Sequence, residues 1–482
     1  MRVLGELQPQ AVFYYFEEIS RIPRGSRHTK AISDYLVDFA KARNLTYYQD
    51  SDNNVVILKD GTAGYEESEP VIIQGHMDMV CETEPQADID METEGIRLQV
   101  QGDFVAADRT TLGGDDGIAV AYALALLDAE DIPHPPLEVV ITVDEEIGML
   151  GAYSVDLSML KGHKMLNIDS DVEGIFLTGC AGGMSLHSQI PVSYAEQSGL
   201  ELSICVTGLL GGHSGSEIDK EHANADILMG RVFSTLADVT AFGITELSGG
   251  AKDNAIPREA KAYVLLPPDS RRAVEAVLYQ LNDELKKEYS VTEPTLTVSY
   301  RFGDVVQKDM LDFSSVNKII YFLRMTPNGV QNMCTDGSGL VETSLNLGIM
   351  ELTKTSFDTV TSVRSSVSTR KTDVAEKVAM LVQMLGGEVT VEGDYPAWEY
   401  CEESQVRTQI GEIYRELFGK EATFQSIHAG LECGVLSEKI PNLDCVSFGP
   451  DNYDIHTPQE RLSISSTERM WRLILEFLKR SK

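Results

Sequence analysis

The chain has 482 residues, of which 43% are apolar and 24% are charged. This length is ample for a packed core and too great for a single one, so we expect two domains. With 75 acidic and 40 basic residues the formal net charge is −35, and such a surface repels nucleic acid and anionic membranes. Neither is therefore expected as a partner, and the simplest role of the charge is to aid solubility.

The cysteines and the N-terminal segment indicate the cellular compartment in which the protein is expected. Seven cysteines form no CxxC pair, their number is odd, and most lie in apolar runs, which is typical of reduced thiols in a cytoplasmic protein. The segment MRVLGELQPQ lacks the apolar core of a secretory signal. No uncharged apolar run approaches the roughly 20 residues that span a bilayer.

The first part of the chain alternates predicted helices with predicted strands. Helical spacing of apolar residues occurs in 9–22, 28–44 and 117–131. Strand-type runs occupy 54–59, 71–75, 137–143 and 164–168. This alternation predicts an α/β domain with a mixed, mostly parallel sheet flanked by helices.

From residue 184 the pattern changes to strands and helices in an α+β order that occurs twice. The predicted strands are 200–208, 259–266, 295–302, about 342–352, 357–368 and 388–393, and the predicted helices are 224–239, 270–289, 315–325 and 373–385. We therefore predict a catalytic domain of residues 1–183 and 395–482, interrupted by a lid domain of residues 184–394 made of two similar antiparallel-sheet units. The closing helix, 466–480, has an apolar stripe that should pack on the first domain.

Five polar clusters contain residues that can bind metal ions. They are VIIQGHMDM (71–79), TLGGDDG (111–117), VVITVDEEIGMLG (139–151), MLNIDSD (165–171) and FGPDNYDIHTPQERL (448–462). In three of them a strand-type run ends where the polar residues begin, and ligands of open α/β sheets bind outside the carboxyl ends of the strands. Imidazole and carboxylate without cysteine suit zinc, manganese or cobalt. The clusters indicate a metal-dependent hydrolase.

The pair His76 and Asp78 and the pair Asp115 and Asp116 each have a simpler explanation than metal binding. His76 and Asp78 point the same way on an extended chain, so one can bind metal while the other accepts a hydrogen bond from the far ring nitrogen. Alone, they are more simply a polar pair at a strand end. Asp115 and Asp116 could merely cap the helix that follows. Their glycine-rich turn also allows an unusual backbone, which a bridging carboxylate would need, and two carboxylates there exclude a phosphate-binding loop.

The remaining acidic clusters fit the same site. Asp144, Glu145 and Glu146 repel one another unless a cation or a proton intervenes, and one glutamate can bind metal while its neighbour acts as general base. A solvated charge run is the alternative, weakened by the buried strand before it. Asp169 or Asp171 could each be a ligand, with Asp169 nearer the strand. His456 lies in a Pro-bounded loop, where a lone histidine is more often solvated.

Three residues of the predicted lid are further candidates. His213 lies in a glycine loop, GLLGGHSGSEI. Arg364 lies in a strand-type run, where an arginine is usually an ion-pair partner. Asn254 lies in DNAIPREA, where a plain turn is the simpler role.

These motifs, in this order, resemble the metallopeptidase family that contains aminoacylase, glutamate carboxypeptidase and bacterial dipeptidases. The motifs that carry the resemblance are GHMDMV, TTLGGDDGIAVA, DEEIGMLGA, NIDSD, GGHSG, NAIPREA, SVRSS and HTPQERL. They span nearly the whole chain.

The resemblance implies a role for each candidate. Two zinc ions per chain are implied, with manganese or cobalt as possible substitutes. One would be bound by His76 and Asp169, the other by Glu146 and His456, and Asp115 would bridge them. Asp78 would support His76, Glu145 would be the general base, and His213 would polarise the scissile carbonyl. Asn254 and Arg364 would hold the substrate, the arginine by its terminal carboxylate. The resemblance also suggests a homodimer through the lid.

Two segments depart from the family pattern. The loop LGGDDG stands where LGADNG is more common, but its first acid is retained. The segment SEIDKEHANA lacks a histidine near 219, and His222 is a weak substitute. These departures affect substrate preference more than catalysis.

The predicted function is metal-dependent hydrolysis of dipeptides, of the Xaa-His type or broader. An N-acyl amino acid deacylase or a short-peptide carboxypeptidase is the alternative within the family, and a requirement for a free α-amino group would separate them. A catalytically inactive metal-binding module is the alternative from another class, but Glu145, Glu146, Asp115 and His456 are all present. A nucleotide-binding protein would need a Walker or Rossmann motif, and the chain has neither.

Overall fold

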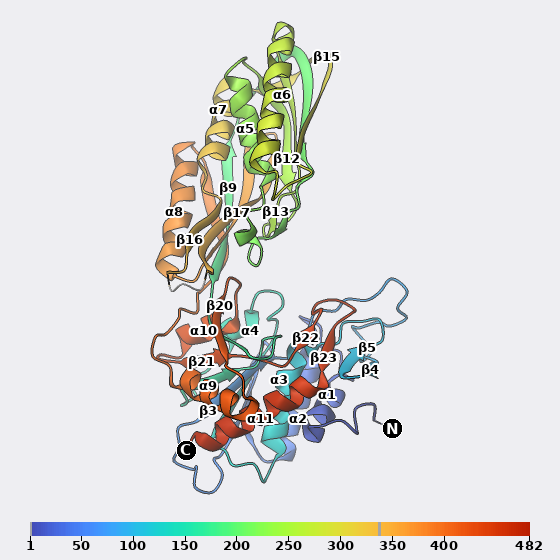
Figure 1. The fold of residues 1–482 in the computed structure, drawn as a ribbon, viewed down its shortest axis with the longest axis vertical. Coiled ribbons are helices and arrows are strands. Elements are labelled where there is room, and N and C mark those ends of the chain that lie inside the picture. The colour runs from blue at the N-terminus through green and yellow to red at the C-terminus, as the bar shows by residue number, and fades with distance from the viewer. Residues whose placement is uncertain (1, 336–338) are drawn as a thin grey trace. The chain divides into compact units, whose positions relative to one another are not determined.

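The computed structural model describes residues 2–335 and 339–482, which form two units (Figure 1). The first contains the described residues up to Cys180, together with Tyr400–Ser426 and Leu431–Lys482. The second contains Ala181–Glu399 and the short segment Ile427–Gly430. The predicted first domain, 1–183 and 395–482, differs from this division in three short stretches, because 181–183, 395–399 and 427–430 belong to the second unit.

The first unit consists of helices around an eight-stranded sheet, with a smaller sheet beside it. Its helices are α1 (Gln10–Ile19), α2 (Lys30–Ala42), α3 (Gly114–Asp128), α4 (Leu150–Ser154), α9 (Gln405–Phe418), α10 (Glu432–Lys439) and α11 (Ile464–Arg480). The main sheet contains, in spatial order, β1 (Thr46–Gln49), β2 (Val55–Lys59), β6 (Leu137–Thr142), β3 (Val71–His76), β7 (Lys164–Asn167), β21 (Asp444–Ser447), β8 (Ile175–Cys180) and β20 (Thr423–Ile427). The smaller sheet contains β22 (Asn452–Tyr453), β23 (Arg461–Ser463), β5 (Phe104–Ala107) and β4 (Leu98–Gln101).

The centre of the main sheet is parallel. Strand β3 pairs in parallel with β6 and β7, and β7 pairs in parallel with β21, whereas β2 and β8 join antiparallel at the flanks. Every residue of β3 and β6 is buried, as the continuous apolar runs of these strands predict. The predicted mixed sheet flanked by helices is confirmed, and its parallel centre brings the ends of β6, β3, β7 and β21 to one edge.

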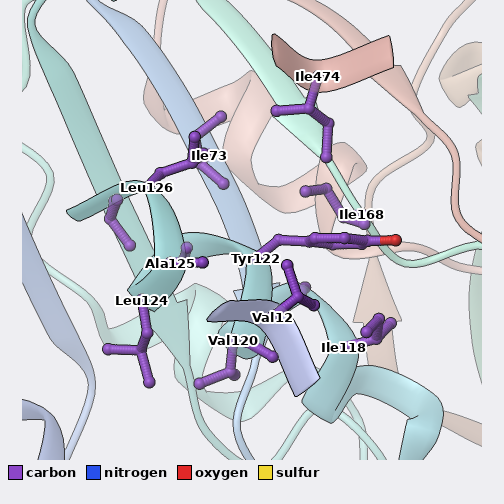
Figure 2. Packing of buried hydrophobic residues seen from close by; sticks show 14 of the residues in the cluster. Val12, Ile73, Ile118, Val120, Tyr122, Leu124, Ala125, Leu126, Ile168 and Ile474 are labelled. Carbon is purple, nitrogen blue, oxygen red and sulfur yellow. The ribbon is translucent and has the colours of Figure 1, made fainter. Parts of the chain in front are cut away.

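Helix α3 is buried on nearly all sides, because its sequence is apolar all round. Figure 2 shows its residue Tyr122 among aliphatic side chains from the sheet and the neighbouring helices. The Tyr122 hydroxyl donates a hydrogen bond to the carbonyl of Thr467 (2.8 Å), and its ring stacks on Trp471 with centroids 5.8 Å apart. Helix α11, which carries Thr467 and Trp471, thus packs on the first unit as its apolar stripe predicts.

The second unit is an α+β domain. Its main sheet contains β15 (Thr297–Leu311), β10 (Tyr194–Thr207), β14 (Ala260–Leu266), β12 (Gly243–Gly250), β17 (Val341–Leu352), β18 (Ser356–Ser365), β9 (Gly182–Pro191) and β19 (Glu388–Tyr395), with β16 (Gly329–Met333) beside β17. A two-stranded sheet contains β11 (Gly212–His213) and β13 (Ala255–Ile256). The helices are α5 (Ala225–Ala237), α6 (Arg271–Glu288), α7 (Phe313–Met325) and α8 (Ser368–Met384), and the 3₁₀ turns are η1 (Ile218–Lys220) and η2 (Pro268–Ser270).

The two sheet units predicted for this domain are joined into one antiparallel sheet. The connection is the pairing of β12 with β17, in which Gly250 lies opposite Ile349. Buried residues alternate along β10, and the helices share one hydrophobic cluster with the buried face of the sheet. The two predicted units are therefore halves of a single antiparallel sheet.

Side-chain caps explain where several helices begin. Asn224, Asp312, Ser404 and Ser463 each precede a helix and accept a hydrogen bond from a backbone N–H in its first turn. Among the helices of residues 2–335 and 339–482, none has the length and apolarity needed to cross a membrane.

Candidate metal centre

The predicted ligands of the first unit lie at the edge where its parallel strands end. His76 is the last residue of β3, the run Asp144–Glu146 follows β6, and Asp169 follows β7. His76 lies opposite Thr142 in the parallel register of β3 with β6. Three segments that are distant in sequence therefore present polar side chains side by side.

Asp115 lies between two imidazole rings. Its Oδ1 is 3.2 Å from Nε2 of His76, and its Oδ2 is 3.2 Å from Nε2 of His456. Asp169 Oδ1 lies 3.7 Å from the same His76 nitrogen, and Glu146 Oε2 lies 3.0 Å from the same His456 nitrogen. The arrangement is two sets of possible ligands, each with one histidine and one acid, that share the carboxylate of Asp115.

The second aspartate of the glycine-rich loop has a different environment. Asp116 is 1% exposed, and its carboxylate accepts a hydrogen bond from the backbone N–H of His76 (3.1 Å). Burial raises the pKa of this carboxyl well above its usual range, and the charge of Asp169 adds to the shift. Asp116 also lies close enough to His76 and Asp169 to complete a metal-type group with them. Its hydrogen bond to the backbone of β3 gives it a structural role as well.

Asp78 contacts the far ring nitrogen of His76 through two of its groups. Nδ1 of His76 lies 3.1 Å from the backbone carbonyl of Asp78 and 3.4 Å from its carboxylate. The carboxylate also accepts hydrogen bonds from Ser26 Oγ (2.8 Å) and from the N–H groups of Glu145 (3.1 Å) and Glu146 (3.4 Å). Asp78 is therefore placed to orient His76, and its side chain also holds the acidic run.

The three acids after β6 are not equivalent. Asp144 has a left-handed backbone (φ 54°) and accepts a hydrogen bond from the N–H of Arg27. Glu146 approaches His456, while Glu145 Oε2 lies 4.0 Å from Nε2 of His76. Burial raises the pKa of Glu145 well above its usual range. A buried carboxyl with a raised pKa is suited to exchange protons near neutral pH.

The charges of this centre favour a cation. Burial raises the pKa of Asp169 to about 6, and nearby carboxylates add to that shift. Hydrogen bonds to Asp115 and Glu146 raise the pKa of His456 to about 10, although burial opposes them. Burial raises the pKa of Asp115, but hydrogen bonds to His456 and His76 outweigh this effect, so the pKa lies below its usual range. Two imidazoles and several carboxylates, with no thiolate in the groups found among the described residues, match the ligand preferences of zinc, manganese and cobalt.

A buried polar network that the sequence analysis missed lies beneath the ligands. Glu432, at the start of α10, is fully buried and accepts hydrogen bonds from Gln74 Nε2 (2.5 Å) and Thr142 Oγ1 (2.7 Å). Asn167 Nδ2 donates to Gln74 Oε1 (2.5 Å). The network thus joins the ends of β3, β6 and β7. Burial raises the pKa of Glu432 to about 7. A glutamate in AGLECG gives no sequence signal of this burial, which depends on the placement of α10.

The three candidates of the predicted lid lie in the second unit. His213 ends β11 and Arg364 lies in β18, and burial together with the charge of Arg364 lowers the pKa of His213. Asn254 lies beside the histidine loop, since its carbonyl accepts the N–H of Ser214 (2.8 Å). Arg364 Nη1 donates to the Tyr395 hydroxyl (2.9 Å), while its buried Nε has no hydrogen-bond partner in the described structure.

His428 is a further residue of this group that the sequence analysis missed. It lies in Ile427–Gly430, and its Nε2 is 2.8 Å from Ser344 Oγ. Burial lowers its pKa to about 4, and the charge of Arg364 adds to the shift. A histidine in the segment SIHAGLE resembles any loop histidine, so only the return of this segment to the second unit identifies it.

Comparison with known proteins agrees with the motifs. The family model described as Peptidase family M20/M25/M40 matches residues 72–480. The cytosol non-specific dipeptidase of Escherichia coli (strain K12) is 35% identical over 483 residues, which cover 99% of each chain. The crystal structure of aminoacylhistidine dipeptidase from Vibrio alginolyticus matches with a TM-score of 0.92 and 32% identity, over 99% of this chain and 97% of that one.

A more distant structure shares the fold alone. A tripeptidase from Staphylococcus aureus subsp. aureus Mu50 matches with a TM-score of 0.56 and 18% identity, over 99% of each chain.

The family model and the two similar relatives confirm the resemblance inferred from the motifs along nearly the full length of the chain. Because the family model and the relatives cover nearly all of its residues, the chain belongs to the peptidase family M20/M25/M40.

Proposed function

We propose that this chain is a metal-dependent dipeptidase that hydrolyses the peptide bond of dipeptides, of the Xaa-His type or more broadly. The observation that carries the proposal is Asp115, whose two oxygens each lie 3.2 Å from a different histidine, with Glu145 beside them. The E. coli relative is a non-specific dipeptidase and the V. alginolyticus relative an aminoacylhistidine dipeptidase, and both support the substrate class.

The proposed centre holds two zinc ions, with manganese or cobalt as possible substitutes. His76 and Asp169 would bind one ion, Glu146 and His456 the other, and Asp115 would contact both. When bound, such ions would supply Lewis-acid chemistry, which lowers the pKa of water and stabilises negative charge on a substrate carbonyl. Neutral histidine nitrogens and carboxylates are the ligands that these ions accept from this residue set.

Glu145 would be the general base and then the general acid. Its raised pKa lets it accept a proton from the attacking water and return that proton to the leaving amine. Asp78 would keep Glu145 in place, since its carboxylate accepts the Glu145 backbone N–H. The acid-base step thus depends on residues from two neighbouring strand ends.

The second unit would supply the substrate contacts. The lowered pKa of His213 favours a neutral imidazole, which can donate a hydrogen bond to the carbonyl oxygen as charge develops. Arg364 can bind the terminal carboxylate of a dipeptide, and its buried Nε is an unused donor for this purpose. Asn254 would hold the substrate backbone. A clamp on the free carboxylate would restrict the enzyme to short peptides.

The exposed side chains of the second unit support an assembly, and the cysteines support a cellular location. We expect a homodimer formed by the second unit, since α7 and α8 expose apolar side chains at Tyr321 (57%), Met325 (66%), Met380 (63%) and Met384 (84%). We expect a cytoplasmic protein, because all seven cysteines lie in the described residues and none forms a disulfide.

The test compares Glu145→Gln with Asp144→Asn. Glu145→Gln should keep the bound zinc and lose roughly 10²–10⁴-fold in kcat on a dipeptide panel, because the amide cannot accept the proton. Asp144→Asn, in the neighbouring acid that points to Arg27, should remain within a few-fold of wild type. Equal activity of the Glu145→Gln variant and the wild type would reject Glu145 as the general base. Hydrolysis of N-acetylated amino acids in preference to free dipeptides would assign a deacylase instead.

A further inference from the structure

Two buried side chains of opposite charge hold the loop that carries Asp115. Arg24 is 1% exposed and Glu460 is 2% exposed, and neither belongs to the proposed ligands or to the acid-base step. Arg24 comes from the segment between α1 and α2, and Glu460 from the segment between β22 and β23, whose places in the first unit Figure 1 shows. Charged groups are rarely buried so completely without partners, so the contacts of this pair indicate what they stabilise.

Glu460 accepts hydrogen bonds from four consecutive backbone N–H groups. Its Oε2 binds the N–H of Leu112 (2.8 Å) and Gly113 (2.9 Å), and its Oε1 binds those of Gly114 (2.8 Å) and Asp115 (3.2 Å). The Asn452 side chain donates to Oε1 as well (3.1 Å). Successive N–H groups at the start of a helix form a site for an anion, and here the chain's own carboxylate fills it.

Arg24 holds the opposite side of the same loop. Its Nη2 donates to the carbonyl of Gly113, and its Nη1 donates to the carbonyl of Met77 (2.9 Å). Met77 directly follows the predicted ligand His76, so one guanidinium connects the end of β3 with the Asp115 loop. The N–H of Gly113 therefore binds a carboxylate while its carbonyl binds a guanidinium.

The glycines of the loop provide room for Arg24. A Cβ on Gly113 would lie 2.5 Å from Arg24 Nη2, and one on Gly117 would lie 2.4 Å from the same atom. Gly113 also has a left-handed backbone (φ 68°) that side chains disfavour. The pattern LGGDDG is thus explained by the buried arginine as well as by the turn.

From these contacts we propose that Glu460 and Arg24 are positioning residues that set the place of Asp115 between His76 and His456. Glu460 follows His456 by four residues and so ties the Asp115 loop to the segment of one histidine, while Arg24 ties that loop to the segment of the other. This proposal rests on the proposed function, because it concerns the two cations of that centre. It predicts that loss of either residue weakens metal binding although no ligand is removed.

The test uses Glu460→Gln and a matched control, Glu138→Gln. The amide keeps the volume of the carboxyl but places a donor against the backbone donors of the loop. Glu138 is also buried (4% exposed) and also accepts two backbone N–H groups, those of Lys161 (2.8 Å) and Gly162 (3.0 Å), but it lies at the start of β6, away from the ligands. The control thus measures the loss of a buried carboxylate that has only a structural role.

Four quantities are measured for each variant: zinc affinity by competition with a chelator, kcat and KM on a dipeptide, and the melting temperature of the metal-free protein. Glu460→Gln should weaken zinc binding by about 10–100-fold, the effect typical of residues that orient metal ligands, and should lower kcat with little change in KM. Glu138→Gln should keep zinc affinity within about twofold even where its melting temperature falls as far.

Zinc affinity of Glu460→Gln equal to that of Glu138→Gln would overturn the proposal. Arg24→Lys provides a second variant if Glu460→Gln does not fold, since lysine keeps the charge but cannot bind both carbonyls, and the same loss of affinity is expected. Wild-type protein that binds no zinc and hydrolyses no dipeptide would instead reject the proposed function, so the two failures are distinguishable.

Discussion

Gly117→Ala offers a quantitative test of the buried arginine. Gly117 lies in the first turn of α3, where alanine ordinarily stabilises a helix by about 1 kcal/mol relative to glycine. Here the new methyl group would lie 2.4 Å from Arg24 Nη2 and 3.3 Å from Phe16 Cε2. Overpacking of this kind costs about 1–3 kcal/mol. Displacement of Arg24 from one carbonyl adds about 1.5–3 kcal/mol, the value of a hydrogen bond to a charged group.

The sum predicts a net loss of about 1.5–5 kcal/mol in the free energy of unfolding of the first unit. Urea titration of the metal-free protein in a Trp398→Phe background would measure it, because Trp471 on α11 then becomes the only tryptophan. Gly411→Ala in α9 is the control, since its methyl group meets only the Phe424 ring at 3.1 Å and should change stability by less than about 1 kcal/mol. A Gly117→Ala protein as stable as wild type would refute the reasoning.

Two further predictions concern the proposed metals and substrate. In the metal-free protein, hydrogen bonds to Asp115 and Glu146 raise the pKa of His456 to about 10. Burial lowers the pKa of His76, but hydrogen bonds to Asp115 and Asp169 outweigh it and raise that pKa. A cation must displace any proton that these rings hold. Zinc binding should therefore release up to two protons per chain, measured with a pH indicator, and tighten by about tenfold per pH unit for each proton, whereas release of none would contradict the assignment. Arg364→Ala should reduce kcat/KM for free dipeptides and spare C-terminally amidated ones, and an equal loss on both would argue against a carboxylate clamp.

Much of the candidate site could be predicted from the sequence because its signals are local. His76 and Asp169 directly follow apolar runs long enough to be buried strands, and parallel neighbours end at one edge. The structure brings these residues together with Asp115, Glu146 and His456, while their roles as ligands stay predictions. What made the prediction possible is that each strand carries its own polar residue at its end.

Arg24 and Glu460 could not be predicted in the same way. Arg24 lies in PRGS, which indicates only a break between two helices, and Glu460 lies in a polar loop. Both segments look solvent-exposed because a charged side chain in a loop usually is. Their burial depends on contacts with a loop more than eighty residues from Arg24 and more than three hundred from Glu460, which no local pattern records.

The joined sheet of the second unit illustrates the same limit. The repeated order of helices and strands predicts each half, but the pairing of β12 with β17 depends on how the halves meet. Gly249 and Gly250 at the end of β12 give no signal of that pairing, since glycines are equally common in turns. Element types were therefore easier to predict than the strand pairing that joins the two halves.

The place of β21 in the main sheet has a consequence for biosynthesis. β7 and β8 are consecutive strands, yet β21 lies between them and is made only after the whole second unit. Until β21 has left the ribosome, β7 and β8 each have an unpaired edge on the side where β21 belongs. Unpaired strand edges can pair with other chains. We therefore expect chaperones that bind exposed strands to engage this protein late in translation, and truncated products to aggregate rather than accumulate as folded fragments.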